Sequence, residues 1–198
     1  MTLSKFSSRW DASGQIPNRA VADGFITRFG AIDDTEGGET SRTNITLKYH
    51  KKITKDRYIT TQAYMSNYDF QLFSNFTFFL NDPINGDQIK QKEQRNLYGM
   101  ESRLTQNYNL GSVEGKFRLA AGVRYDDINN IALFNTVNRK TLIQGLALGN
   151  INETNIFAYT DYTANYKKWQ ANIGVRRDQI YYLYENSLTT TYEITEKK

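Results

Sequence analysis

The chain of 198 residues is 39% hydrophobic and 23% charged, and it has no cysteine, which excludes disulfide frameworks, thiolate metal sites and cysteine nucleophiles. Its net charge of +4 comes from basic residues spread along the chain, a distribution that does not indicate a nucleic-acid partner. No apolar run approaches the ~20 residues that a membrane helix needs, and the first ten residues lack the apolar region of a secretory signal. If the protein meets a membrane, we expect it to do so with strands.

The first long connection follows an opening strand and is expected over Gly14–Ser41. It is polar and rich in glycine, and it contains a group of carboxylates. Calcium bound through oxygen is one interpretation of this group and a solvated acidic loop is the other, because the spacing is not that of an EF-hand. The four carboxylates are those of Asp33, Asp34, Glu36 and Glu39.

Two alternating segments follow this connection. Arg42–His50 places apolar or β-branched residues at every second position, which predicts a strand that ends at a solvated His50 rather than at a metal ligand. Tyr58–Leu72 also alternates, but its apolar side changes midway along the segment. A bulge or a strand end near Asn67 would explain that change.

A second long polar loop is expected over Leu80–Arg95. Its segment NDPINGDQ contains ordinary turn-forming residues, and it lacks the glycine spacing and the lysine of a phosphate-binding loop. With one histidine in the chain, no Ser-His-Asp arrangement can be assembled convincingly, so we do not expect an enzyme.

The segment KFRLAAGVRYDD, Lys116–Asp127, alternates strictly. Its apolar face requires a cover, which either a second protein layer or a lipid bilayer would supply. Asp126 and Asp127 point to opposite faces of such a strand and do not suit an acid–base pair. Further strands are expected near Tyr98–Leu104, Ile156–Ala164 and Trp169–Arg176, and we expect about eight or nine strands in the whole chain.

Short connections alternate with the two long ones, and aromatic residues lie near the strand ends. Hairpin turns are expected at His50–Asp56, Asn109–Gly115 and Asn165–Trp169. This asymmetry is typical of transmembrane β-barrels, in which one strand face meets lipid and the other meets a polar lumen. The residues predicted to line the lumen are Lys116, Arg118, Arg124, Gln170, Asn172 and Arg176.

The segment SRWDASGQIPNRAVADGFITRFGAIDDTEGGETSR, which begins at Ser8, resembles a strand, loop and strand of the barrel of TonB-dependent outer-membrane receptors. Ser74–Arg95 resembles a later extracellular loop of these receptors, and VRYDD and NETNIFAYTDYT resemble their strand ends. The residues that carry the first motif are Trp10, Gln15, Ile16, Pro17, Arg19, Ala20 and Val21, followed by Arg28, Phe29, Gly30, Ile32, Asp33, Thr35, Gly37 and Gly38.

This resemblance implies an all-β fold, an antiparallel up-and-down transmembrane β-barrel segment with about eight or nine strands of a barrel of twenty-two, not closed on its own. Residues 1–198 would form a partial barrel domain without a plug domain or signal peptide. The resemblance also implies a place in the bacterial outer membrane, in contact with its lipid. The implied function is energised uptake of a large scarce nutrient such as a ferric siderophore, driven by the TonB complex through the plug and requiring no cofactor.

Two other functions are open at this point. A soluble or surface-attached carbohydrate-binding β-sandwich predicts that Phe117, Leu119 and Val123 are buried against a second sheet. A passive porin would share the barrel but lack the receptor-like loops. The receptor predicts one continuous curved sheet whose apolar face has no protein over it.

Overall fold

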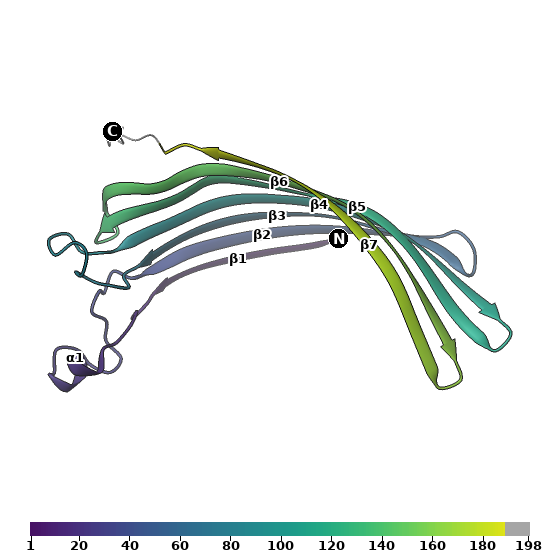
Figure 1. Cartoon of the computed structure of the whole chain (residues 1–198), viewed down its shortest axis with the longest axis horizontal. Helices are drawn as coiled ribbons and strands as arrows, with labels where there is room; N and C mark the ends of the chain where they lie inside the picture. The colour runs from purple at the N-terminus through teal and green to yellow at the C-terminus, as the bar shows by residue number, and fades with distance from the viewer. Residues whose placement is uncertain (189–198) are drawn as a thin grey trace.

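The computed structural model describes residues 1–188, and in these residues seven antiparallel strands form one sheet in the order of the sequence. Figure 1 shows a single curved layer that is not closed, with β1 and β7 at its two edges. The predicted all-β, up-and-down fold is confirmed. The elements are β1 (Thr2–Asp11), α1 (Asn18–Ala22), β2 (Gly37–Lys52), β3 (Arg57–Ser74), β4 (Ile89–Leu110), β5 (Val113–Val137), β6 (Thr141–Tyr166) and β7 (Trp169–Asn186).

The expected number of about eight or nine strands is too high for the described residues. β4, β5 and β6 contain 22, 25 and 26 residues, so fewer and longer strands use the same length of chain. The extra length lies beyond Asp127, where the alternation that identifies β5 in the sequence becomes irregular. All three register shifts between β5 and β6 fall in this part of the pair, the first of them between Ile128 and Ile131.

No second layer covers the apolar face within residues 1–188. The side chains of Leu119 and Ile173 are 49% and 74% exposed, and Val123 is 41% exposed. These values contradict the β-sandwich, which required the same face to be buried. The described residues therefore leave this apolar surface uncovered, and anything that covers it must come from outside residues 1–188.

The three predicted hairpin turns are confirmed, and Figure 1 shows them together at one end of the sheet. Residues 53–56 connect β2 to β3, residues 111–112 connect β4 to β5, and residues 167–168 connect β6 to β7. Gly111 and Lys167 have φ of 60° and 53°, the left-handed conformation that two-residue hairpin turns favour.

Two of the three connections at the opposite end are longer, although they differ from the predicted loops, and the third is the short β5–β6 turn of residues 138–140. Residues 12–36 connect β1 to β2 and include the five-residue helix α1, while residues 75–88 connect β3 to β4. Ile89–Arg95 belongs to β4 and pairs with β3, so the second half of the predicted loop is wrong. Its residues are polar on both faces, and the sequence of such a strand cannot be told from that of a loop.

The predicted bulge or strand end near Asn67 is also wrong. β3 pairs with β2 and with β4 through Asn67 without a register shift. The nearest shift lies between β4 and β5 at Lys92 and Gln94, where Asn130 has a φ of 54°. The change of apolar side in β3 therefore reflects what each part of the strand faces, and the backbone stays regular.

Candidate functional site

The pairing register divides the side chains between two faces, because residues directly opposite each other in an antiparallel pair share a face. We call the face that carries Leu119 and Val123 the band face. The face that carries Arg118 and Arg124 is the polar face. The register extends this division from β5 to all seven strands.

The band face carries apolar side chains over the half of the sheet nearest the short turns. They lie in cross-strand rows, and in the row through Val123 the side chains of Met100 and Ile156 are both 50% exposed. Exposed apolar side chains in consecutive rows form a continuous surface rather than isolated positions. This row contains Leu47, Ala63, Met100, Val123 and Ile156.

The apolar surface ends at the same row in five neighbouring strands. In the last apolar row, the rings of Tyr98 and Tyr125 stack with their centroids 6.5 Å apart. We call this the boundary row, and it contains Leu3, Ile45, Met65, Tyr98 and Tyr125. The next row toward the loops is polar and contains Lys5, Thr43, Asn67, Asn96 and Asp127.

Beyond these five strands, the edge of the apolar surface shifts toward the short turns in β6 and β7. In β7 this surface extends from Trp169 to Val175 and is followed by Arg177, whereas the row through Val175 reaches β2 at Lys51, below the apolar part of that strand. A band that crosses tilted strands must shift along each successive strand. The edge over β6 and β7 shifts in this way, whereas the edge across β1–β5 follows a single row.

Aromatic side chains also mark the end of the band face nearest the short turns, as predicted. Tyr108 and Tyr162 stack with ring centroids 5.5 Å apart, and the ring of Tyr108 lies across Gly115, where a Cβ would overlap it. Trp169 is 80% exposed beside the last turn. Rings with one polar atom suit the depth at which hydrocarbon gives way to headgroups.

The six residues predicted to line a lumen all lie on the polar face. The register places Lys116, Arg118 and Arg124 on it in β5, and the paired residues of β6 carry the same face to Gln170, Asn172 and Arg176 in β7.

Each of the three arginines in this set is paired with a carboxylate. Arg118 Nη2 lies 2.6 Å from Asp161 Oδ1, which belongs to the neighbouring strand. Arg124 binds Asp126 two residues along its own strand, with Nε 2.8 Å from Oδ2. The guanidinium groups of Arg118 and Arg124 are thus neutralised on the polar face.

Arg176 repeats the second arrangement in β7. Its Nη2 lies 2.7 Å from Asp178 Oδ1, and its guanidinium lies 4.2 Å from the centroid of the Phe157 ring. The ion pair and the cation–π contact fix the side chain against the sheet.

The remaining three predicted residues are not part of an ion pair within residues 1–188. Gln170 Nε2 donates to Asn165 Oδ1 at 2.9 Å, and Asn172 Nδ2 donates to Thr163 Oγ1 at 2.8 Å. Lys116 is exposed and forms no ion pair with the described residues.

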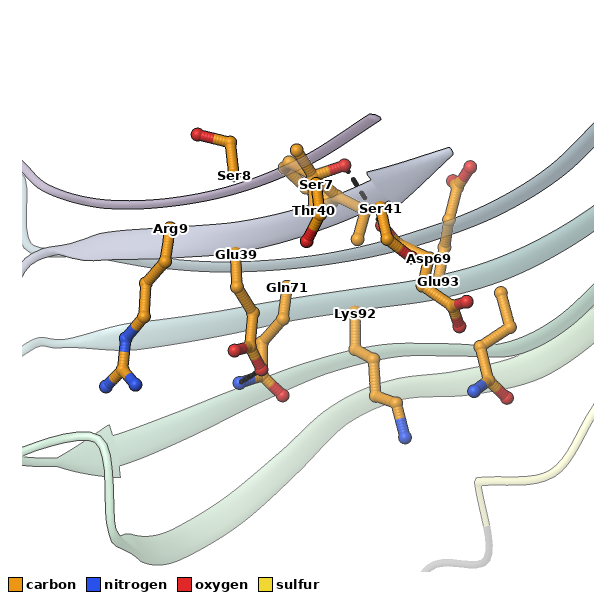
Figure 2. Close-up of a pocket in the computed structure, with 12 residues that line it drawn as sticks. Ser7, Ser8, Arg9, Glu39, Thr40, Ser41, Asp69, Gln71, Lys92 and Glu93 are labelled. Atoms are coloured by element: carbon orange, nitrogen blue, oxygen red, sulfur yellow. Dashed lines mark hydrogen bonds between the residues drawn. The ribbon is translucent and has the colours of Figure 1, made fainter. Parts of the chain in front are cut away.

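Beyond the boundary row, the band face becomes a polar groove of about 530 Å³. Figure 2 shows Arg9, Glu39, Gln71 and Lys92 projecting into it from four neighbouring strands. Gln71 Nε2 donates to Glu39 Oε1 at 3.3 Å. The same face thus changes from apolar to charged within three rows.

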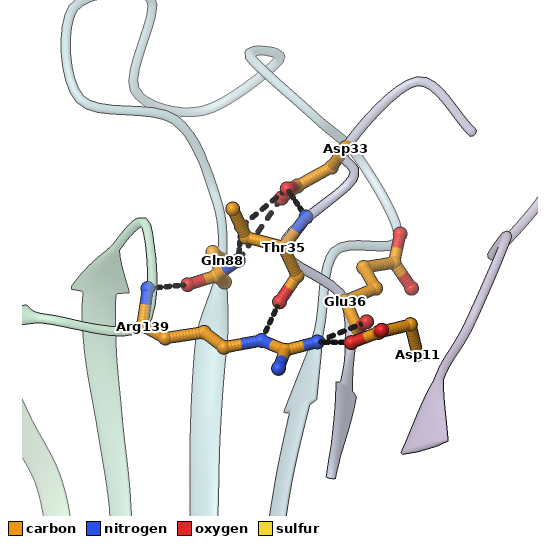
Figure 3. Close-up of polar contacts among 6 residues, drawn as sticks. All are labelled: Asp11, Asp33, Thr35, Glu36, Gln88 and Arg139. Atoms are coloured by element: carbon orange, nitrogen blue, oxygen red, sulfur yellow. Dashed lines mark hydrogen bonds and ion pairs between the residues drawn. The ribbon is translucent and has the colours of Figure 1, made fainter.

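A buried polar cluster joins the loops at the end of the sheet away from the short turns. At its centre the side chain of Gln88, 2% exposed, uses both its oxygen and its nitrogen (Figure 3). Nε2 donates to Asp33 Oδ2 at 3.0 Å and to Thr35 Oγ1 at 2.6 Å. Oε1 accepts from Thr136 Oγ1 and from the backbone N–H of Arg139, both at 2.9 Å.

The side chain of Arg139 closes this cluster across the sheet. It donates to the carbonyl oxygens of Thr35 and Glu36, and its Nη2 lies 2.8 Å from Asp11 Oδ1 at the end of β1 (Figure 3). Its guanidinium lies 5.6 Å from the centroid of the Phe73 ring. One residue of the β5–β6 turn therefore holds the last part of the β1–β2 connection in place.

The carboxyl groups of Asp33 and Glu36 respond oppositely to this environment. Burial raises the pKa of Asp33, but hydrogen bonds from Thr35, Asn75 and Gln88 outweigh it, so that the net pKa lies below the usual value. Burial raises the pKa of Glu36, and its Oε1 has no hydrogen-bond partner. The folded protein thus disfavours the charged form of the Glu36 carboxyl group.

The four carboxylates of the acidic loop have different surroundings. Within residues 1–188, no group of three or more acidic or histidine side chains is placed to hold a metal ion. Both carboxylate oxygens of Asp33 accept protein hydrogen bonds, and Asp34 is exposed. His50 Nδ1 lies 3.0 Å from Thr60 Oγ1, an ordinary contact at a strand end.

The segment NDPINGDQ forms a hydrogen-bonded turn, as its composition predicts. Asp82 Oδ1 accepts from the backbone N–H groups of Ile84 and Asn85. A hydrogen bond from Thr77 and others from Asn81 lower the pKa of Asp87 to about 2. The carboxylates of Asp82 and Asp87 thus accept hydrogen bonds from the backbone of the turn to which they belong.

Sequence analysis missed the members of the buried cluster that lie outside the first motif. Gln88 and Thr136 are 48 residues apart, and Arg139 and Asp11 are 128 residues apart. No local pattern connects such positions. The only signal was the motif itself, which contains Asp33 and Thr35.

Among the described residues, no helix has the length and hydropathy needed to cross a membrane.

The fold defines a class of protein: a long-stranded, up-and-down sheet with short turns at one end is a segment of the wall of a large β-barrel. Solved structures of TonB-dependent receptors have this fold. The ferric citrate transporter FecA matches with a TM-score of 0.73 at 11% identity, over 93% of this chain and 28% of that chain. The ferric-catecholate import receptor Fiu from E. coli K12 matches in its open form with a TM-score of 0.59 at 12% identity, over 92% of this chain and 32% of that chain.

The closed form of Fiu matches with a TM-score of 0.56 at 13% identity, over 81% of this chain and 27% of that chain. The chain thus spans about a third or less of the length of these receptors. No family model and no curated protein matches the sequence. The likeness is one of fold, and these neighbours are transporters and receptors rather than enzymes.

Proposed function

We propose that this chain forms part of the barrel wall of a TonB-dependent receptor in the bacterial outer membrane. The observation that carries the proposal is the boundary row, at which the band face changes from apolar to polar across five neighbouring strands. A soluble protein has no reason to keep an exposed apolar surface with a straight edge. Lipid acyl chains would cover the surface, and the tyrosines of the boundary row would lie at headgroup depth.

The difference between the two ends of the sheet supports one orientation in the membrane. Barrels of this class have short periplasmic turns and longer extracellular loops. The end with residues 53–56, 111–112 and 167–168 would therefore face the periplasm. The segments proposed to face the outside are Gly14–Ser41 and Leu80–Arg95, including the parts that extend β2 and β4 above the membrane.

The polar face would line the lumen, with Lys116, Arg118, Arg124, Gln170, Asn172 and Arg176 in its wall. The three arginines are each neutralised by a carboxylate, so a charged cargo would find few free charges to hold it there. A wall of this kind suits passage rather than retention.

The cargo would be a large scarce nutrient such as a ferric siderophore. FecA and Fiu are named for ferric citrate and ferric catecholates, which supports this class of substrate. Uptake would be energised by the TonB complex, acting through a plug region that is not part of the described sheet. The proposal includes no enzymatic activity, no cofactor and no nucleic-acid partner.

The test is uptake of radioactive iron by cells that produce the protein as its gene encodes it. We expect accumulation of iron from ferric citrate or a ferric catecholate, lost when the gene or TonB is deleted. Uptake that is lost with the gene but persists without TonB would contradict the receptor and favour a passive porin. Ion conductance of the purified protein in planar bilayers would then confirm an open channel.

A further inference from the structure

One cross-strand row on the polar face alternates aromatic rings with guanidinium groups. Phe6 of β1 lies opposite Arg42 of β2, Arg42 lies opposite Tyr68 of β3, and Tyr68 lies opposite Arg95 of β4. We call these four residues the arginine–aromatic row. It lies on the loop side of the boundary row, so it belongs to the part of the sheet beyond the apolar band.

The guanidinium of Arg42 is held by one edge only. Its Nε lies 3.2 Å from both Asn44 Oδ1 and Ser66 Oγ, and Ser66 in turn donates to Asn44 at 2.8 Å. Within residues 1–188, its two terminal nitrogens have no hydrogen-bond partner and no carboxylate within 4.0 Å. The side chain is therefore positioned by the sheet, while its charge and its remaining donors stay free.

Arg95 differs from Arg42, because its buried Nε has no hydrogen-bond partner among the described residues and has a carboxylate beside it. Its Nε lies 3.2 Å from Glu93 Oε1, and its side chain is 33% exposed. Arg124, which borders the same groove, is neutralised by Asp126. The arginines and carboxylates of the groove thus leave an excess of one positive charge, in contrast to the neutralised arginines farther from the loops.

Aromatic surface is available beside this charge. The ring of Tyr68 stacks with that of Phe70, with centroids 6.1 Å apart and planes inclined by 15°. Phe6 is 58% exposed. The groove that contains Arg42, Tyr68 and Arg95 has a volume of about 390 Å³, enough for an aryl group but not for a complete large chelate.

We propose that the arginine–aromatic row binds an anionic aromatic group. The anionic oxygens would accept hydrogen bonds from the terminal nitrogens of Arg42 and Arg95, whose planar forks match a carboxylate or a pair of phenolate oxygens. The aryl ring would lie against Tyr68 or Phe6. The inference rests on the proposed function in that the group would be the exposed aryl part of the ferric chelate.

The binding test uses the protein extracted from membranes in detergent and calorimetry with three ligands: salicylate, citrate and a ferric catecholate complex. We expect R42Q together with R95Q to weaken salicylate and the ferric complex at least about tenfold, the range for charged bidentate hydrogen bonds. Tyr68→Leu should weaken these two aromatic ligands and leave citrate binding unchanged within about twofold. Lys116→Gln is the matched control, because it removes an exposed cation from the same face outside the row.

Wild-type affinity for the aromatic ligands in the folded R42Q/R95Q protein would overturn the inference and leave the receptor function standing. If the arginine variant does not fold, Tyr68→Leu decides alone, since unchanged salicylate binding also overturns the inference. If the protein binds salicylate through the two arginines but no ferric chelate, the site stands and the proposed function falls. Binding of none of the three ligands would overturn both.

Discussion

The side chain of Arg139 contacts residues of three other parts of the chain at the loop end of the sheet. It reaches from the β5–β6 turn to the end of β1 and to two carbonyl oxygens of the β1–β2 connection, and it lies over the Phe73 ring. A lysine would keep the charge but could not serve three acceptors from one rigid plane. The order of the β1–β2 connection near Thr35 therefore depends on a residue that is distant in the sequence.

We predict that Arg139→Ala loosens residues 33–37 and costs about 2 kcal/mol of local stability, the range for hydrogen bonds to a charged donor. Amide hydrogen exchange of these residues should speed up roughly thirtyfold, while exchange in the middle of β3 stays the same. Lys140→Ala, a change at the neighbouring exposed cation, is the control. Equal protection in the two variants would contradict this role of Arg139.

Glu36 gives a prediction with a defined pH dependence. Because burial raises its pKa in the folded protein, the folded state disfavours the charged carboxylate, and stability is lost as the pH rises through the unfolded and then the folded pKa. Glu36→Gln keeps the shape and removes the charge. Its melting temperature should exceed that of the wild type at neutral pH, and the difference should vanish below the pKa of an unfolded glutamate. A difference that is the same at acid and neutral pH would contradict this assignment.

At the scale of single elements, β3 shows what alternation alone could and could not predict. Near the short turns, its band-face residues Ala63 and Met65 are apolar and its polar-face residue Gln62 is polar, so strand and face follow directly from the sequence. Beyond Asn67 the apolar residues move to the other face, although the pairing is regular. A one-strand pattern cannot reveal such a change, because its cause is the surroundings of the whole sheet.

Neighbouring positions in β3 allow a matched test of the two faces. We predict that Ala63→Arg lowers the free energy of unfolding in phospholipid vesicles by about 2 kcal/mol or more, because it places a charge in the hydrocarbon. Gln62→Arg, one residue away on the polar face, should change it by less than about 0.5 kcal/mol. Urea titrations of the two variants measure the difference. Equal costs at the two positions would mean that lipid does not cover the band face.

The same contrast explains which strands were recognisable in the sequence. The alternating part of β5, near Leu119, lies in the apolar band and is recognisable from the sequence, whereas Ile89–Arg95 of β4 lies beyond it and has the composition of a loop. The six polar-face residues followed from alternation, but their carboxylate partners did not. Asp161, for example, reaches Arg118 only through the register between β5 and β6.

At the scale of the whole molecule, the boundary row predicts the position along the strands at which band-face side chains become accessible to water. The chain has no cysteine, so single cysteines can be placed without background. In intact outer membranes, Asp69→Cys should react with a membrane-impermeant maleimide and Ala63→Cys should not, because the two positions lie on the band face on opposite sides of the row. Detergent-solubilised and denatured protein should label at both. Labelling of Ala63→Cys in the intact membrane would contradict the location of the band.

The ion pairs Arg124–Asp126 and Arg176–Asp178 each lie within one strand, two residues apart. Such a pair needs no neighbouring strand, so it can form as soon as its own segment is extended. A segment that carries its own counter-charge can join a growing wall at any stage without exposing an isolated charge to lipid. For Arg124 and Arg176, neutralisation is thus a property of the individual segment and places no constraint on the order in which the wall is assembled.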